Sequence, residues 1–330
     1  IVIWGAIRGI RQFAEEYIAA FQQIESAAAH MAFVVQASTQ EAMMASMELA
    51  SRMAQYGVEP TQAAAAQLTA ARYGAIGGGR LADMAAQLSM VTGGQVEMAE
   101  AMEFLLSVQR QWNIESENSG EILDVLATMY RNAPGEMREF MQYMREGPGL
   151  AQQMGQSFRE NMLMAAEAMS YLPGRTPTAV ASMIRRMMSR VYQRDTAMRL
   201  AQQYGISVYD EATLERRPGA EVLADIARKF QEIGSESERA ALAELVAGTR
   251  QGQAWADAYV LLENYDGLIQ ATHQDLASFG DLADTVKDTH TTAINEMMAS
   301  WKLLRQELGT AIGIPDWIER FTNKMRDFYE

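Results

Sequence analysis

The sequence predicts an all-α protein, and its composition is the main reason. Its 330 residues include 24 Met, long runs of Ala and only 7 Pro. Met and Ala are good helix formers, whereas the β-branched residues that favour strands are sparse. We therefore expect a long N-terminal coiled-coil-like helix, followed by helical hairpins or a bundle. At most one very short β element is expected, near residues 206–209.

A seven-residue repeat marks the first helix. One apolar set recurs at Ile3, Ile10, Tyr17, Ile24 and Met31, and a second follows four residues later at Ile7, Ala14, Phe21, Ala28 and Val35. Such a seam buries one stripe of a helix against a second copy or against a later helix of the same chain. No Gly or Pro occurs in residues 10–56. One unbroken helix is therefore expected there, roughly 70 Å long at about 1.5 Å per residue.

Glycines divide the following part of the chain into shorter helices. Helical segments are expected near 81–91, up to about 112, 118–131, 135–146 and 149–171. Gly93-Gly94, Pro134 and Gly147-Pro148-Gly149 separate most of them, because Gly and Pro end helices. We expect three regions: a coiled-coil-type helix over 1–56, a helical core domain over 57–280, and a C-terminal helical segment over 281–330 that continues into a longer chain.

A strong helix start lies at Thr176-Pro177, a hydroxyl N-cap followed by proline at the first helical position. We expect this helix to continue to Gly205. Ser235 and Glu238 have the spacing of a capping box for a later helix. In the helix after Thr176, the expected buried face is Val180, Met183, Ile184, Met187 and Val191, and the expected opposite face is Arg185, Arg186 and Arg190.

The last apolar stripe lies near the C-terminus. Apolar residues recur three or four positions apart at Ile294, Met297, Trp301, Leu304 and Leu308. This spacing is typical of an amphipathic helix that packs on another surface. Together with the first seam and the three arginines, Trp301, Leu304 and Leu308 are our candidates for an oligomer or partner interface. The first-seam members of that set are Ile3, Ile7, Ile10, Tyr17, Phe21, Ile24 and Met31.

Charge and cysteine content exclude several functions. The chain has no Cys, so it has no disulfide, thiolate metal site or cysteine nucleophile. Its formal net charge is −14, with six Arg against one Asp over residues 175–199. A nucleic-acid binder normally shows a broad basic field, so we expect no stable nucleic-acid binding. The basic helix is interpreted as a surface for a partner or for the chain's own acidic part.

No motif predicts a catalytic, cofactor or metal site. The glycine-rich segment Gly74–Arg80 lacks the Lys-Ser/Thr pair of a phosphate loop. The three histidines, His30, His273 and His290, are not spaced as metal ligands. Glu263 precedes Gly267-Leu268-Ile269-Gln270, which faintly resembles the turn after the catalytic Glu of lytic transglycosylases. No Glu-Ser pair stands at the matching distance upstream.

The order of motifs over residues 171–270 resembles the core of phage tail tape measure proteins. It runs from YLPGRTP through an Arg/Met-rich helix and GISVYD to two short helices that end in Gly-Thr-Arg. Residues 45–75 and 289–315 resemble the family's earlier helical turn and closing helix. One departure lies at residues 210–213, where family members often have a Gly, and it weakens the expectation of a tight hairpin there.

The resemblance implies a structural role without cofactors. Such a protein would lie in the tail lumen or tail tip of the virion, nucleate tail assembly, set tail length and leave at infection. It would associate with itself as a homotrimer, with tail tube protein, with distal tail or baseplate hub proteins, and with assembly chaperones in the host cytoplasm. A transient contact with the host membrane stays open, as does a phage-derived particle such as a gene transfer agent.

Two other classes remain as alternatives. A secreted helical translocator or pore-forming protein would share the Cys-free, Met-rich composition, but no apolar run reaches the ~20 residues that span a bilayer. A muralytic tail enzyme would use Glu263 as its general acid, which requires a carbohydrate cleft and a raised pKa.

Overall fold

The computed structural model describes residues 2–75, 79–210, 212–248, 252–287 and 299, with side chains from residue 19 onward. All regular elements in this described part are helices, and the only β feature is an isolated bridge between Tyr209 and Arg216. The all-α prediction is confirmed. The chain forms two compact units, one comprising residues up to Leu106 with the described residues from Gly280, and the other comprising Ser107–Phe279.

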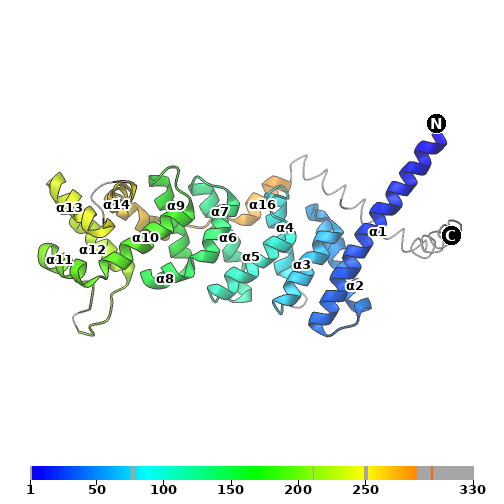
Figure 1. Cartoon of the computed structure of the whole chain (residues 1–330), viewed down its shortest axis with the longest axis horizontal. Helices are drawn as coiled ribbons and strands as arrows, with labels where there is room; N and C mark the ends of the chain where they lie inside the picture. The colour runs from blue at the N-terminus through cyan, green and yellow to red at the C-terminus, as the bar shows by residue number, and fades with distance from the viewer. Residues whose placement is uncertain (1, 76–78, 211, 249–251, 288–298, 300–330) are drawn as a thin grey trace, which may run out of the picture. The chain divides into compact units, whose positions relative to one another are not determined.

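The first unit is built on three helices that all pack against one another: α1 (Val2–Val35), α2 (Thr39–Met53) and α3 (Pro60–Arg72). A short 3₁₀ helix, η1 (Ala54–Tyr56), follows α2, and α4 (Gly79–Val91) and α5 (Met98–Gln111) come next (Figure 1). Ala28, Ala42 and Ala71 meet at the centre of the three-helix packing, beside Met31. Their small side chains let the helix backbones approach closely.

The predicted unbroken helix over residues 10–56 is wrong. α1 ends at Val35, Gln36 adopts a left-handed φ of 56°, and α2 begins after Ser38. Ser38 and Glu41 form a complete capping box, in which the Ser38 hydroxyl accepts from the Glu41 N–H at 3.2 Å. The Ser-x-x-Glu signal was present in the sequence, but the absence of Gly and Pro concealed the break.

The second half of the predicted seam packs inside the chain. Ile24 and Met31 are buried against the neighbouring helices, and Phe21 is half-buried. These positions are therefore occupied by intrachain contacts. Ile3, Ile7, Ile10 and Tyr17 lie outside the residues whose side chains are described. Trp301, Leu304 and Leu308 also lie outside the described residues.

The second unit is arranged around α9 (Phe158–Tyr171), which contacts five other helices: α6, α8, α10, α14 and α15. Its residues are buried on nearly every side, as expected for a central helix. The buried polar Asn161 accepts from the Tyr143 hydroxyl at 2.9 Å and donates to Gln156 at 3.0 Å. The surrounding elements are η2 (Ser116–Asn118), α6 (Gly120–Asn132), α7 (Met137–Glu146), α8 (Pro148–Met154), α10 (Pro177–Val191), α11 (Arg194–Tyr204), α12 (Gly219–Glu232), α13 (Glu236–Ala247), α14 (Gln253–Glu263) and α15 (Tyr265–Thr272); α16 (Phe279–Lys287) follows.

Two helices predicted as continuous are each divided in the structure. The segment 149–171 breaks at Gly155, whose left-handed φ of 67° ends α8, and Ser157 with Glu160 then forms a capping box for α9. The helix that starts at Thr176 ends at Val191, and α11 begins at Arg194 before ending at the left-handed Gly205. The break lets α11 bury its own face, including Leu200.

The capping box predicted at Ser235 and Glu238 does not form. Ser235 occupies the N-cap position of α13, but its side chain makes no capping hydrogen bond. The spacing of Ser235 and Glu238 is compatible with a capping box, but the side-chain conformations decide whether its hydrogen bonds form.

Candidate functional site

The basic segment that the sequence singled out is helix α10. Its N-cap Thr176 accepts a hydrogen bond from the Ala179 N–H at 3.2 Å, with Pro177 in the first turn. The predicted inward face is confirmed, because all five of its members are buried: Val180, Met183, Ile184, Met187 and Val191. This burial fixes the rotation of α10 and therefore the direction of its arginines.

The three arginines of α10 do not form one surface. Arg185 and Arg186 are exposed. Arg190 is half-buried, and its Nε donates to the Leu245 carbonyl at 3.1 Å. That carbonyl is in the last turn of α13, where cationic donors stabilise a helix. The prediction of one exposed Arg face is corrected for Arg190, which joins α10 to α13.

A cavity of about 400 Å³ lies in the first unit, and a smaller one of about 290 Å³ opens beside α10 in the second. Arg175, which belongs to the Gly-Arg-Thr-Pro start of α10, pairs with Asp257 of α14 at 3.0 Å. Gln253 donates a second hydrogen bond to Asp257 at 2.8 Å. The cavity beside α10 is lined by Leu172, Arg175, Ala179, Val180, Met183, Arg186, Gln253, Ala254 and Asp257.

The charged groups around the smaller cavity differ in whether each has a partner of opposite charge. Asp257 is only 8 % exposed, and its carboxylate is compensated by Arg175 and Gln253. Arg186 is exposed, and its Nε donates only to the Ser182 carbonyl of its own helix at 3.3 Å. Its terminal nitrogens have no partner among the described residues. The cavity therefore combines an apolar floor with one uncompensated cation at its edge, which suits an apolar group that carries a negative charge beside it.

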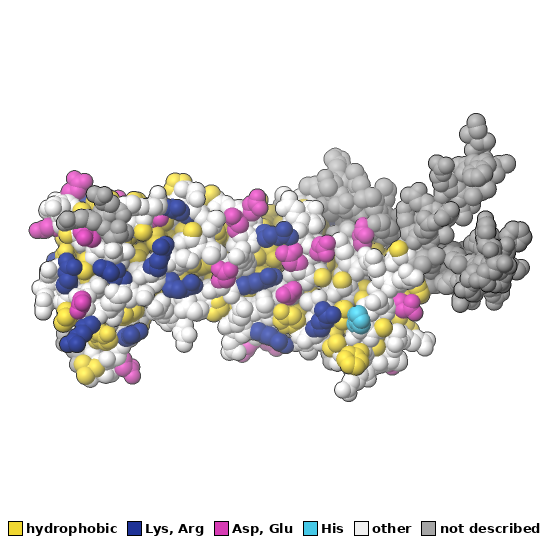
Figure 2. Space-filling model, viewed as in Figure 1, with side chains coloured by type: hydrophobic (Ala, Val, Ile, Leu, Met, Phe, Trp, Pro, Cys, Tyr) yellow, Lys and Arg dark blue, Asp and Glu magenta, His cyan; other side chains and the backbone are white. Residues whose placement is uncertain are grey.

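Figure 2 shows Lys and Arg side chains spread singly over one face of the second unit, with apolar side chains between them. A broad basic field is not seen on this face. The sequence motif Gly-Arg-Thr-Pro had indicated Arg175, but Asp257 and Gln253 were missed. They lie about 80 residues further along the chain, and no local pattern connects them to Arg175.

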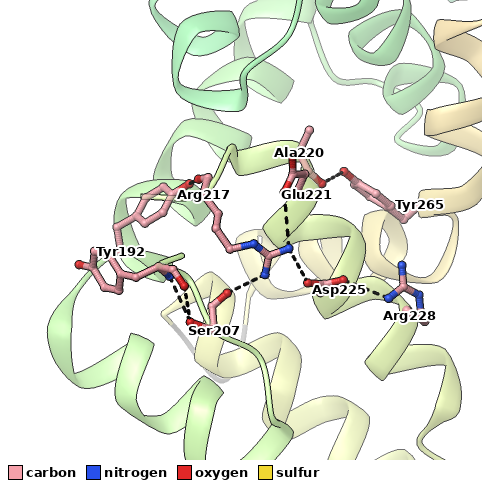
Figure 3. A network of polar contacts seen from close by, with 9 residues as sticks. Tyr192, Ser207, Arg217, Ala220, Glu221, Asp225, Arg228 and Tyr265 are labelled. Carbon is pink, nitrogen blue, oxygen red and sulfur yellow. Dashed lines mark hydrogen bonds and ion pairs between the residues drawn. The ribbon is translucent and has the colours of Figure 1, made fainter. Parts of the chain in front are cut away.

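A second polar centre lies at Arg217, between α11 and α12 (Figure 3). Its guanidinium donates to the Ser207 carbonyl at 2.8 Å and pairs with Asp225 at 2.9 Å. The Tyr192 hydroxyl donates to the Arg217 carbonyl at 2.7 Å. Burial raises the pKa of Tyr192 above its ordinary value. The network fixes the base of the loop 206–217 on the helices.

The loop itself is a closed hairpin, contrary to the sequence expectation. The Asp210 N–H donates to the Glu215 carbonyl at 2.9 Å, and the Arg217 N–H donates to the Val208 carbonyl at 3.1 Å. A glycine is not needed, because Leu214 adopts the left-handed conformation with a φ of 58°. Asp210 stabilises the turn by accepting from the Ala212 and Thr213 N–H groups at 2.9 and 2.8 Å. These hydrogen bonds lower the pKa of Asp210.

The glutamate that resembled a transglycosylase acid lies at a helix end, near a tightly packed glycine. Glu263 is exposed at the end of α14. Gly267 packs directly against the Tyr171 hydroxyl, and a Cβ there would overlap it. Close packing between α15 and α9 therefore accounts for this glycine without a catalytic turn.

The described residues contain no group of three His, Asp or Glu that could hold a metal ion. His30 and His273 are exposed, and His290 lies outside the described part. Among the helices with described residues, none is both long and apolar enough to cross a bilayer.

Comparison with known proteins identifies the family. A family model described as "Phage-related minor tail protein" matches residues 48–248, which is more than half of the chain. The match contains α10, the loop 206–217 and α13, although α14 and its Asp257 lie beyond it. No curated protein and no solved structure matches the chain. The all-helical chain belongs to the family of phage-related minor tail proteins, and its role is that of a phage tail protein.

Proposed function

We propose that this phage tail protein is the tail tape measure protein. It occupies the lumen of the tail tube or tail tip, nucleates tail assembly, sets tail length and is released at infection. The observation that carries the proposal is the family match over residues 48–248. It coincides with the ordered motifs Gly174–Pro177, 205–210 and 235–250 that resemble the tape measure core.

The partners follow from this role. The protein associates with itself as a homotrimer, with tail tube protein, with distal tail or baseplate hub proteins, and with assembly chaperones in the host cytoplasm. Neither stable nucleic-acid binding nor a cofactor belongs to the proposal, and contact with the host membrane would be transient. The scattered basic side chains of the second unit and its acidic background support the exclusion of nucleic acid.

The protein is proposed to act without catalysis. The carboxylate in the cavity beside α10, Asp257, is paired with Arg175 and hydrogen-bonded to Gln253, which supports a structural role for this carboxylate. The close packing of Gly267 against Tyr171 gives this glycine a structural explanation, which supports the proposal of a role without catalysis. Particles carrying Glu263→Gln should assemble and degrade peptidoglycan as the wild type does, whereas loss of such activity in this variant would favour the enzyme.

The test of the tail role is electron microscopy of particles made with residues 176–247 deleted in frame. If this segment contributes as helix to a ruler, tails shorten by roughly 110 Å at about 1.5 Å per residue. Absence of tails would instead indicate initiation of assembly. The matched control is Arg199→Ala, an exposed position on α11, which should leave tails normal. Normal tails in the deletion, with the shortened chain present in the lysate, would contradict the proposal.

A further inference from the structure

The loop 206–217 exposes an apolar side chain to solvent at its tip. Leu214 is 78 % exposed, the highest value for a large apolar residue in the described part of the second unit. Its backbone has a left-handed φ of 58°, a conformation that is unfavourable for a residue with a Cβ. Glu215, the next residue, is exposed and has no ion-pair partner among the described residues. We name Leu214 and Glu215 the tip.

Hydrogen bonds and an ion pair hold described residues on both sides of the tip. Asp210 accepts three hydrogen bonds from Ala212 and Thr213 within the turn, and Arg217 fixes the base through the network in Figure 3. Figure 1 shows this loop, between α11 and α12, projecting beyond the neighbouring helices. A preorganised apolar side chain loses little conformational entropy when it binds, so the tip has the properties of an interface anchor.

A complementary surface lies elsewhere on the same unit. The cavity beside α10 measures about 290 Å³, which is more than one leucine side chain fills. Val180 and Met183 contribute to its apolar floor, and Arg186 stands at its edge with terminal nitrogens that have no partner in the described part of the chain. An arginine can bind a carboxylate through two parallel hydrogen bonds. The cavity therefore matches both parts of the tip, an apolar side chain and an adjacent carboxylate.

We propose that the tip of one copy of this chain binds the cavity beside α10 of a second copy. Leu214 enters the apolar floor, and the Glu215 carboxylate pairs with Arg186. Within one copy the tip is exposed to solvent, so it does not fill its own cavity. The two surfaces differ, so the contact is heterologous and repeats around a closed ring or along a filament. This contact provides a structural basis for the self-association that belongs to the proposed function. The observations behind the contact do not otherwise depend on the tail role.

Cysteine cross-linking tests the contact directly, because these 330 residues contain no Cys. One preparation carries Leu214→Cys and another carries Ala179→Cys, an exposed position in the cavity lining. Mixing them under mild oxidation should give a disulfide-linked heterodimer within minutes. The matched control replaces Leu214→Cys with Met198→Cys, which is also exposed but lies on α11 outside both surfaces. Equal cross-linking in both mixtures would overturn the proposal.

Sedimentation velocity of the full chain provides an independent test. Leu214→Gly relieves the backbone strain, so the fold is retained, and it should weaken self-association at least tenfold. Arg186→Glu should weaken it similarly, and the double exchange Arg186→Glu with Glu215→Arg should restore most of it. A wild-type chain that stays monomeric at millimolar concentration, or a Leu214→Gly variant that associates as the wild type does, would refute the contact. Tails shortened by the deletion of 176–247 would still support the tail role in that case.

Discussion

Gly219 gives the sharpest test of how the second unit is packed. It is the first residue of α12 and is buried where that helix meets α8 and α10. A Cβ built there would lie 2.8 Å from the Met188 sulfur, 2.9 Å from the Gln153 carbonyl oxygen and 3.0 Å from the Met154 sulfur. The sulfur atoms belong to flexible side chains, but the carbonyl belongs to the backbone of α8. Gly219→Ala therefore requires α8 and α12 to separate.

Two effects with opposite signs decide how much Gly219→Ala changes the free energy of unfolding. Alanine in place of glycine favours a helix by about 0.5–1 kcal/mol. Overpacking of a core by one methyl group typically costs about 1–3 kcal/mol. The close backbone contact places Gly219→Ala in the destabilising range, with an expected net loss of up to roughly 2.5 kcal/mol. For a unit of this size the midpoint of thermal unfolding should fall by up to roughly 10 °C.

Gly149→Ala is the matched control, because Gly149 lies in the first turn of α8 and no atom beyond its chain neighbours and its own helix backbone lies within 4 Å of the position that an added methyl group would occupy. Only the propensity term remains there, so this variant should be as stable as the wild type or slightly more stable. Differential scanning calorimetry of the full chain compares the two variants under identical conditions. A Gly219→Ala protein as stable as Gly149→Ala would refute the reasoning from close packing.

Three further outcomes are expected. Arg175→Met should lower the unfolding free energy by about 1–3 kcal/mol, because it leaves the buried Asp257 carboxylate with one partner; the value is moderate because the arginine is itself 31 % exposed. Arg186→Met should change the unfolding free energy by less than about 0.5 kcal/mol. Equal values for the two variants in denaturant titrations would contradict the roles given to these arginines. Ser157→Ala should cost about 1 kcal/mol at pH 7 through loss of the N-cap. Hydrogen bonds from the Ser157 backbone and hydroxyl lower the pKa of Glu160 below its ordinary value of 4.5. Their stabilisation is therefore present above pH 4.5 and is lost as the pH falls through the lower pKa of the folded state. The difference in unfolding free energy between Ser157→Ala and the wild type should narrow on acidification, and a widening difference would contradict this account. Leu214→Gly should raise the unfolding free energy by about 0.5–1 kcal/mol by relieving the left-handed backbone, and a loss of stability in urea titration would show that Leu214 contributes packing within its own copy.

Local patterns in the sequence were sufficient for most of the helices. The apolar face of α10 was predicted residue by residue, because a helix of period 3.6 fixes which positions share a side. The end of α11 at Gly205 was also predicted, and the left-handed φ of 70° there explains the residue. The break at residues 36–38 was encoded by Ser38 and Glu41, but it carried no Gly or Pro and was therefore overlooked.

The sequence by itself determined the helical class, the buried face of α10 and the likeness to phage tail proteins, since each depends on residues close together in the chain. Only the tertiary structure decided that Arg190 reaches α13 while Arg186, one turn earlier, donates only to its own helix among the described residues. Only it paired Arg175 with Asp257. The physical reason is that a buried ion pair depends on how two helices pack together when they lie far apart in the sequence. Neither helical periodicity nor residue spacing contains that information.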